Sequence, residues 1–412
     1  MKRLVTVITV LMGFGAALAQ NAAVSESRLS PAQQAMEQAQ KLIEKNAKDY
    51  EAYNALALAL ARRARETSNP NFYSQGEQVL QKSFAISPGN YDGKRVEVWL
   101  LLGKHEFAAA LEAAKPLNRK MPDDVMVWSF LTDANAELGN YSHAEQAAQQ
   151  MLNLRPGYLP ALTRAAYLRE LFGDPQGALE LMQMALESSP PSESEDRAWI
   201  TTQMAHLKLG MGKTTEAEGL LENALTMFPG CHYALGNLAK VRIQQQRYEE
   251  GVLLLKQRYN AAPHAENLFD LAVALKLAGR RSEAKNAFAE FEQKSLLETA
   301  KADNSNHELI LYYADYANQP AKALEVATRE YTRRHDVFTL DCYAWALHVN
   351  GRDSEARNPM NAALGVGIQD VKMFRHAAEI ASRTGDPTSA RRYLKLAAEL
   401  EGKTPKLATA KY

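Results

Sequence analysis

The sequence predicts an all-helical protein, built as a solenoid of about ten helix-turn-helix repeats. The first observation is a series of prolines at steps of 34 residues with one step of 39: Pro88, Pro122, Pro156, Pro190, Pro229 and Pro263. A second series, of small residues, keeps nearly the same interval: Gly76, Ala110, Ala144, Ala178, Ala217, Gly251, Ala284, Ala323, Ala356 and Ala390. The third observation is composition, since abundant helix-forming residues and only 8% aromatic residues favour helix over strand. Together they predict stacked repeats rather than separate globular domains.

The clearest repeat runs from Val125 to Pro156. An apolar stripe at helical spacing fills its first half, Gly139-Asn140 interrupts the helix, and a second stripe precedes the proline. The stripes consist of Trp128, Leu131, Asn135 and Leu138, and of Ala144, Ala148 and Met151. A small residue at Ala144 allows two antiparallel helices to approach closely, which a larger side chain would prevent.

This unit resembles the tetratricopeptide repeat, in which a large residue opens the first helix, a glycine turns the chain and small residues open the second helix. The matching residues are Trp128, Leu131, Leu138, Gly139, Tyr141, Ala144, Ala148 and Pro156. The resemblance covers about Pro31 to Gly402 and implies a right-handed superhelix. Tryptophan opens only this one repeat, and the two steps of 39 residues require insertions near 191–196 and 297–306, where we expect junctions between repeats.

The first residues indicate export. Lys2 and Arg3 precede an apolar run over residues 4–18, and Ala17-Leu18-Ala19 offers small residues for cleavage before Gln20. The run is short for a membrane span, although an uncleaved anchor is the alternative. We expect an exported protein, periplasmic or secreted, without membrane insertion after cleavage.

Five segments follow from these patterns. Residues 1–19 are the expected signal peptide, 20–30 a flexible N-terminus, 31–46 a capping helix, 47–402 the repeat solenoid and 403–412 a C-terminal tail.

Charge and cysteine content narrow the possible partners. Lys plus Arg equals Asp plus Glu, 48 of each, so no global field attracts nucleic acid and we expect no nucleic-acid partner. Cys231 and Cys342 lie three repeats apart. Because each repeat of a solenoid is expected to touch only its neighbours, and a disulfide requires Cα atoms within ~7 Å, we expect two free thiols.

No pattern predicts catalysis. Residues 207–214, LKLGMGKT, are similar to a phosphate-binding loop, but Leu207 stands where the first glycine is required and no strand precedes it. The nine histidines show no paired metal-ligand spacing. We therefore expect no enzyme activity, no catalytic or metal-binding residues and no cofactor.

The resemblance implies a concave groove, lined by the first helix of each repeat, that binds peptides or partner helices. The carboxylate clamp of one subgroup is not matched, because the corresponding residues begin with Ser129, Asp133 and Thr163 and offer little positive charge. Aromatic residues and one histidine occupy equivalent groove positions instead: Trp99, Tyr167, His206, Tyr312 and Trp345. They are either anchors for a ligand or packing between repeats, and the sequence leaves both interpretations open.

The sequence thus favours an exported scaffold of a bacterial envelope that mediates protein–protein or protein–peptide interactions. The alternative is a glycan-associated scaffold in polysaccharide handling or secretion, with aromatic rings stacked on sugars. The partner's identity does not follow from the residues.

Overall fold

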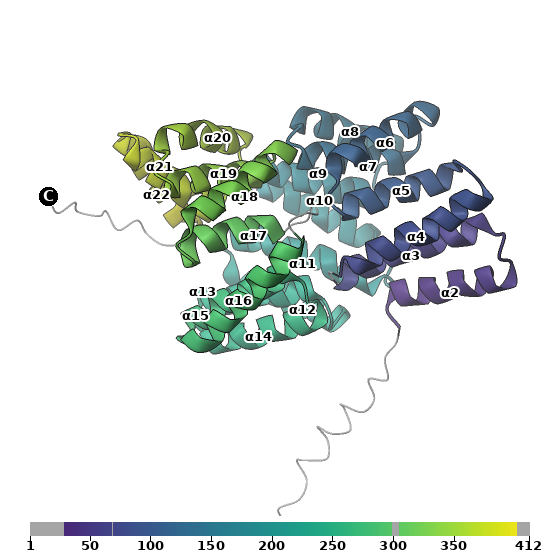
Figure 1. The fold of residues 1–412 in the computed structure, drawn as a ribbon, viewed down its shortest axis with the longest axis horizontal. Coiled ribbons are helices and arrows are strands. Elements are labelled where there is room, and N and C mark those ends of the chain that lie inside the picture. Colours follow the sequence, from purple (N-terminus) through teal and green to yellow (C-terminus); the bar gives the residue numbers. More distant parts are fainter. Residues whose placement is uncertain (1–28, 68, 299–304, 402–412) are drawn as a thin grey trace, which may run out of the picture.

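The computed structural model describes residues 29–67, 69–298 and 305–401, and within these ranges the chain is helical throughout, without strands (Figure 1). The predicted signal peptide and C-terminal tail lie outside the described residues. In the described chain, α2 (Pro31–Lys45) precedes ten consecutive helix pairs. The predicted all-α solenoid of tetratricopeptide-like repeats is confirmed.

The first five pairs are α3 (Tyr50–Thr67) with α4 (Asn71–Ile86), α5 (Tyr91–Gly103) with α6 (Phe107–Lys120), α7 (Val125–Glu137) with α8 (Tyr141–Leu154), α9 (Leu159–Leu171) with α10 (Pro175–Ser188), and α11 (Ser194–Gly210) with α12 (Thr214–Met227). The next three are α13 (His232–Gln244) with α14 (Tyr248–Ala261), α15 (Ala265–Leu277) with α16 (Arg281–Glu298), and α17 (Ser305–Leu311) with α18 (Pro320–Arg333). The last two are α19 (Val337–Val349) with α20 (Asp353–Val366), and α21 (Val371–Arg383) with α22 (Pro387–Leu400).

The pair α7–α8 shows how the sequence builds one repeat. The Asp124 carboxylate caps α7 by accepting hydrogen bonds from the backbone amides of Met126 and Val127. Gly139 ends the first helix in the left-handed region, at φ +80°, where a glycine carries no steric cost. Ala144 is completely buried, so the two helices meet as closely as the sequence predicted.

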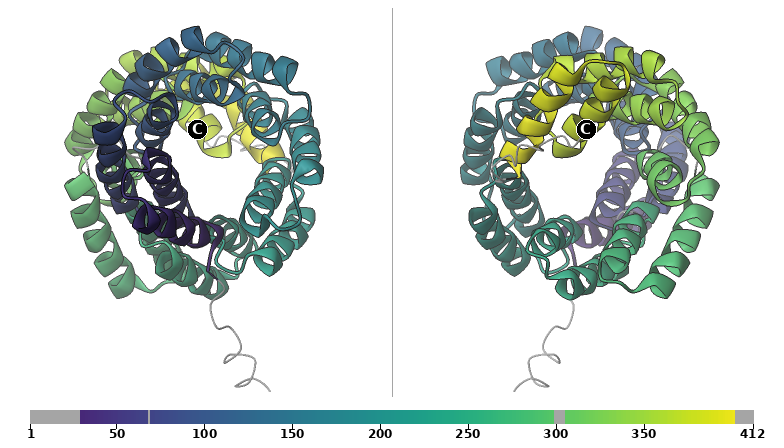
Figure 2. Two further views of the ribbon diagram at one scale, coloured as in Figure 1. Left: turned by 90° about the vertical axis from the view of Figure 1, so that its right-hand side faces the viewer. Right: turned by 90° about the vertical axis from the view of Figure 1, so that its left-hand side faces the viewer.

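The repeats coil about one axis, and both end-on views in Figure 2 show a ring of helices. In Figure 1 the even-numbered helices, such as α8, α14 and α20, lie outermost, and the odd-numbered helices lie nearer the axis. Burial agrees with this arrangement, because α7 buries most of its residues whereas α8 buries four. Exposed side chains of the odd-numbered helices therefore face the axis, and we call this side the inner face.

Contacts between successive turns of the superhelix correct one expectation from the sequence. Repeats do not touch only their neighbours, because the turn after α7 lies against the start of α19, six repeats further on. The backbone amide of Val337 donates a hydrogen bond of 2.8 Å to the Tyr141 hydroxyl, and the Gln369 side chain donates one of 3.3 Å to the Gly173 carbonyl. The superhelix is wound tightly enough for its second turn to rest on its first.

An apolar core joins the two turns along this seam. Its buried members from the first turn are Ala136, Ala144, Ala148, Leu168 and Leu171, and those from the second turn include Val337, Leu340, Ile368, Met373 and Ile380. Two glycines allow the backbones to meet, since a Cβ on Gly139 would collide with the His335 carbonyl oxygen and one on Gly173 would collide with that of Gly367. This part of the superhelix is held closed by hydrophobic burial.

The first insertion is partly helical. The junction expected near 191–196 is non-helical over 191–193, but from Ser194 it lengthens the next helix, so that α11 has 17 residues where α7, α9 and α13 each have 13. Its extra N-terminal turn contains Glu195 and Asp196. Acidic residues are favourable there because the N-terminal end of a helix carries a partial positive charge.

Cys231 and Cys342 are free, as predicted, and both are buried. Burial raises the pKa of the Cys342 thiol well above its usual value, so this side chain behaves as a small apolar core group. None of the helices within the described ranges is long and apolar enough to cross a membrane.

Candidate functional site

The five residues predicted to line the groove lie on α5, α9, α11, the π-helical turn that follows α17, and α19. Each stands eleven positions before the small residue of its repeat, as Tyr167 does before Ala178. Their surroundings differ enough that the residues fall into two groups.

Trp345 is packed against two imidazole rings. The His376 imidazole lies parallel to it with ring centroids 4.1 Å apart, and the His348 ring stacks on it with centroids 4.8 Å apart. The indole N–H donates a hydrogen bond of 2.8 Å to Asp315 of the preceding repeat. Trp345 therefore connects three consecutive repeats.

Trp99 and Tyr312 also pack between repeats. The Trp99 ring meets the edge of Phe130 on the next inner helix at 5.8 Å. Tyr312 begins a π-helical turn, η1 (Tyr312–Tyr316), and its ring packs on Phe288 and Phe291 of α16. For both residues the surrounding contacts are those of an inter-repeat core.

Tyr167 and His206 belong to the second group, because adjacent inner helices bring both toward carboxylates. The Tyr167 hydroxyl lies 3.4 Å from Glu137 Oε1 of the preceding repeat, and His206 Nε2 lies 2.9 Å from Glu170 Oε1. His206 is 46% exposed, so it stays open to water.

A third pair completes this surface. Arg164 Nη2 contacts Asp133 Oδ2 at 2.5 Å, and the Asp133 side chain is 33% exposed. We call the six residues Asp133, Glu137, Arg164, Tyr167, Glu170 and His206 the inner strip. They come from three consecutive inner helices, α7, α9 and α11, and each pair joins one repeat to the next.

Two carboxylates of the inner strip, those of Glu137 and Asp133, lie in an environment that disfavours charge. Burial raises the pKa of Glu137 to about 7, with repulsion from Asp336 and Asp133 adding to it and Arg334 opposing it. Burial also raises the pKa of Asp133, against the attraction of Arg164. Asp336 and Arg334 belong to the second turn, so the tight winding itself perturbs Glu137. Added positive charge from a ligand would stabilise the ionised carboxylates.

The sequence identified Tyr167 and His206 but not their partners. Asp133 occupies one of the positions that correspond to the carboxylate clamp, whereas no sequence pattern singled out Glu137 or Glu170. The hydroxyls at other clamp positions are turned away, since Ser129 donates to the Met126 carbonyl and Thr163 to the Pro160 carbonyl of its own helix. Such hydroxyls bind their own helix backbone rather than a ligand.

Within the ranges that the structure describes, no group of three or more His, Cys, Asp or Glu side chains could hold a metal ion. The residues of the inner strip interact through hydrogen bonds and charge pairs on the surface of three helices. The arrangement can recognise a ligand through several such contacts at once.

A family model described as tetratricopeptide repeat matches residues 208–266, a span that contains α12, α13 and α14. This part of the chain therefore carries a tetratricopeptide-repeat match, and the described chain repeats the same kind of helix pair along its length. Repeats of this class form scaffolds with extended binding surfaces, which supports a role in protein–protein interaction. No curated protein sequence matches the chain.

Similar solved structures include PilW, a widely conserved type IV pilus biogenesis factor, at 14% identity over 50% of this chain and 94% of that chain, with a TM-score of 0.42. The human IFIT1 dimer with PPP-AAAA is 12% identical over 91% of this chain and 96% of that chain, with a TM-score of 0.49. TTC0263, a thermophilic tetratricopeptide-repeat protein of Thermus thermophilus, is 19% identical over 47% of this chain and 99% of that chain, with a TM-score of 0.41. These identities and TM-scores give no ground for transferring a ligand or a role.

Proposed function

We propose that the chain is an exported interaction scaffold whose inner strip binds an extended segment of a protein partner. The observation that supports this most directly is the series of charge and hydrogen-bond pairs that connects α7, α9 and α11 across their inner sides, where two pairs are half-buried and the His206–Glu170 pair is exposed. Neighbouring helices lie roughly 8–10 Å apart. An extended peptide advances about 3.3 Å per residue, so every third residue of a ligand would meet a new repeat.

The charge of the inner strip favours a segment with basic side chains. Three carboxylates, from Asp133, Glu137 and Glu170, stand against the single guanidinium of Arg164. Burial raises the pKa of Glu137, and repulsion from Asp336 and from Asp133 of the inner strip adds to this shift. A lysine or arginine of the partner would relieve the repulsion and form charge-assisted hydrogen bonds.

A protein segment is favoured over a glycan because sugar stacking requires an open aromatic face. The Trp345 indole is already stacked with two imidazole rings of the protein itself. The inner strip presents carboxylates and one phenol instead.

Export is the second part of the proposal. It rests on the basic start, the apolar run and the cleavage pattern before Gln20. Intact-mass measurement of protein from its native host should find Gln20 as the first residue. A protein that retains Met1 would contradict export and leave the binding proposal to be tested by itself.

The binding proposal can be tested by isothermal titration calorimetry with synthetic lysine-rich and arginine-rich peptides. Near pH 7 a bound cation should lower the pKa of Glu137, so that binding releases protons and the measured heat depends on the ionisation enthalpy of the buffer. Glu137→Gln should abolish this buffer dependence and weaken binding.

Glu145→Gln, on the exposed surface of outer helix α8, is the matched control and should change neither property. Equal affinity of the parent and of a Glu137→Gln/Glu170→Gln double variant for every basic peptide would refute the role of the inner strip.

A further inference from the structure

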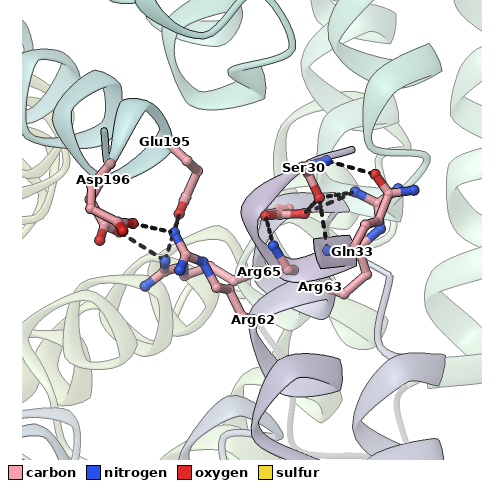
Figure 3. Close-up of polar contacts among 10 residues, drawn as sticks. Ser30, Gln33, Arg62, Arg63, Arg65, Glu195 and Asp196 are labelled. Atoms are coloured by element: carbon pink, nitrogen blue, oxygen red, sulfur yellow. Dashed lines mark hydrogen bonds and ion pairs between the residues drawn. The ribbon is translucent and has the colours of Figure 1, made fainter. Parts of the chain in front are cut away.

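The first repeat is joined to the fifth by charged side chains, as Figure 3 shows. Arg65 Nη2 of α3 lies 2.8 Å from Glu195 Oε2 and 3.1 Å from Asp196 Oδ1 of α11. Arg62 Nη2 lies 3.1 Å from Glu193 and 3.2 Å from Glu195. We call these five side chains the ionic contact. It connects elements that are 130 residues or more apart in the sequence.

The extra turn of α11 supplies the acidic half of this contact. Glu193 precedes the helix, and Glu195 and Asp196 lie in its first turn. Other inner helices of 13 residues, such as α9, lack this extension. The step of 39 residues in an otherwise 34-residue period therefore places three carboxylates where α3 comes within reach.

The three carboxylates of the ionic contact would repel one another if the two arginines did not neutralise them. The Glu195 side chain is 7% exposed and has two further carboxylates beside it. Repulsion among them would push the chain apart once the arginines withdraw. Arg62 and Arg65 stay partly exposed to water, so salt can reach and screen the pairs.

No apolar core spans this junction within the described residues. The core around α3 consists of residues from α3, α4 and α5, and the core around α11 and α13 draws on helices from α11 to α14. The seam between α7–α9 and α19–α21, in contrast, is a continuous apolar core. One seam of the superhelix is thus hydrophobic, whereas the other consists of the ionic contact and one hydrogen-bond contact, in which His232 Nε2 of α13 lies 3.2 Å from the Arg65 carbonyl oxygen.

We propose that the ionic contact is a latch that closes α3 onto α11 and opens when the charges are screened or removed. The closed arc runs through α3, α5, α7, α9 and α11, and the inner strip lies on this arc. An open latch would let a ligand reach the inner strip from the side, and a closed latch would encircle it. Only this last consequence rests on the proposed function, since opening can be measured without a ligand.

Distances between spin labels on α2 and α12 provide the test. Lys41 and Thr226 are exposed positions for introduced cysteines, and the two native cysteines are buried. We expect Arg65→Glu to shift the distances to longer values, and the charge-swapped pair Arg65→Glu/Glu195→Arg to restore them. Parent protein should shift in the same direction between about 0.05 M and about 1 M NaCl, where the screening length falls to ~3 Å.

Arg247→Glu is the matched control, because it breaks an ion pair with Glu250 within the repeat of α14 and should leave the distances unchanged. If Arg65→Glu does not fold, the salt series on the parent decides the question. Unchanged distances in the parent at high salt, or failure of the charge swap to restore those of Arg65→Glu, would overturn the latch. Either result would leave peptide binding to the inner strip unaffected.

Discussion

The indole of Trp345 and the imidazole of His376 are parallel to within 10°, with centroids 4.1 Å apart. His376 is buried, and its Nδ1 lies 2.9 Å from Asp341 Oδ1. The stack therefore rests on a polar pair between α19 and α21, and it gives Trp345 a structural role that its position in the repeat did not reveal.

Trp345→Ala should consequently destabilise the fold. Removing a packed tryptophan typically costs about 3–5 kcal/mol, and the Asp315 acceptor would also lose its donor. Trp345→Phe keeps an aromatic ring that can stack with the histidines and should lose less. Thermal unfolding followed by circular dichroism checks both, and a Trp345→Ala variant as stable as the parent would return this residue to the list of free ligand anchors.

Gly139→Ala should destabilise the closed superhelix more than Gly279→Ala. Both glycines have positive φ, at +80° and +76°, so alanine is strained at either position. Only at Gly139 would the new Cβ also collide with the backbone of the second turn, whereas no heavy atom of the described chain lies within 4 Å of a Cβ at Gly279. Differential scanning calorimetry should show the larger loss for Gly139→Ala, and equal losses would mean that the turns are not in contact in solution.

Ala178→Leu should overpack the pair α9–α10. Ala178 is completely buried, and extra methylene groups in a packed interior cost about 1–3 kcal/mol. Gln183→Lys, on the exposed side of the same helix, should change stability by less than ~0.5 kcal/mol. Melting temperatures provide the comparison, and two equal values would show that the small-residue series does not mark helix contacts.

Glu308→Gln should become progressively stabilising as the pH rises. Burial, with repulsion from Glu266 and Asp270, raises the pKa of Glu308 to about 8, and its Oε2 has no hydrogen-bond partner among the described residues. The folded state therefore holds a proton that the unfolded chain, with a pKa of 4.5, releases. The associated stability is fully present below pH 4.5 and is lost as the pH rises through about 8.

The measurement is the difference in melting temperature between Glu308→Gln and the parent, which should grow from about pH 5 to about pH 9, the interval around these two pKa values. Glu145→Gln on outer helix α8 serves as the control and should show a constant difference. A constant difference for Glu308→Gln as well would mean that the carboxyl is solvated in the native protein.

The fold was predictable because the spacing of small residues and prolines in the sequence is also the spacing of the helix pairs. Small residues such as Ala144 and turn glycines such as Gly139 repeat with the helices themselves, and each pair packs through residues close in sequence. The winding of the superhelix was not predictable in this way. Small rotations between repeats accumulate over six repeats before Tyr141 meets Val337, and no residue pattern of a single repeat encodes that sum.

The candidate site was predictable only in part for the same reason. Equivalent positions identified Tyr167 and His206, but the environment of Glu137 depends on Asp336, almost 200 residues away. Tyr312 illustrates a second limit, since the π-helical turn that begins there changes which face of the helix is buried. Tyr313, and not Tyr312, is consequently the fully buried ring.

The seam between turns also fixes how many repeats the protein can contain. An open solenoid tolerates the loss or duplication of one unit, because each unit needs only its two neighbours. Here the removal of any repeat between α9 and α18 would bring a different backbone segment opposite Gly139 and leave Tyr141 without the Val337 amide. Changes in length should therefore be tolerated at the two ends of the array and selected against within it, so that the number of repeats is itself part of the fold.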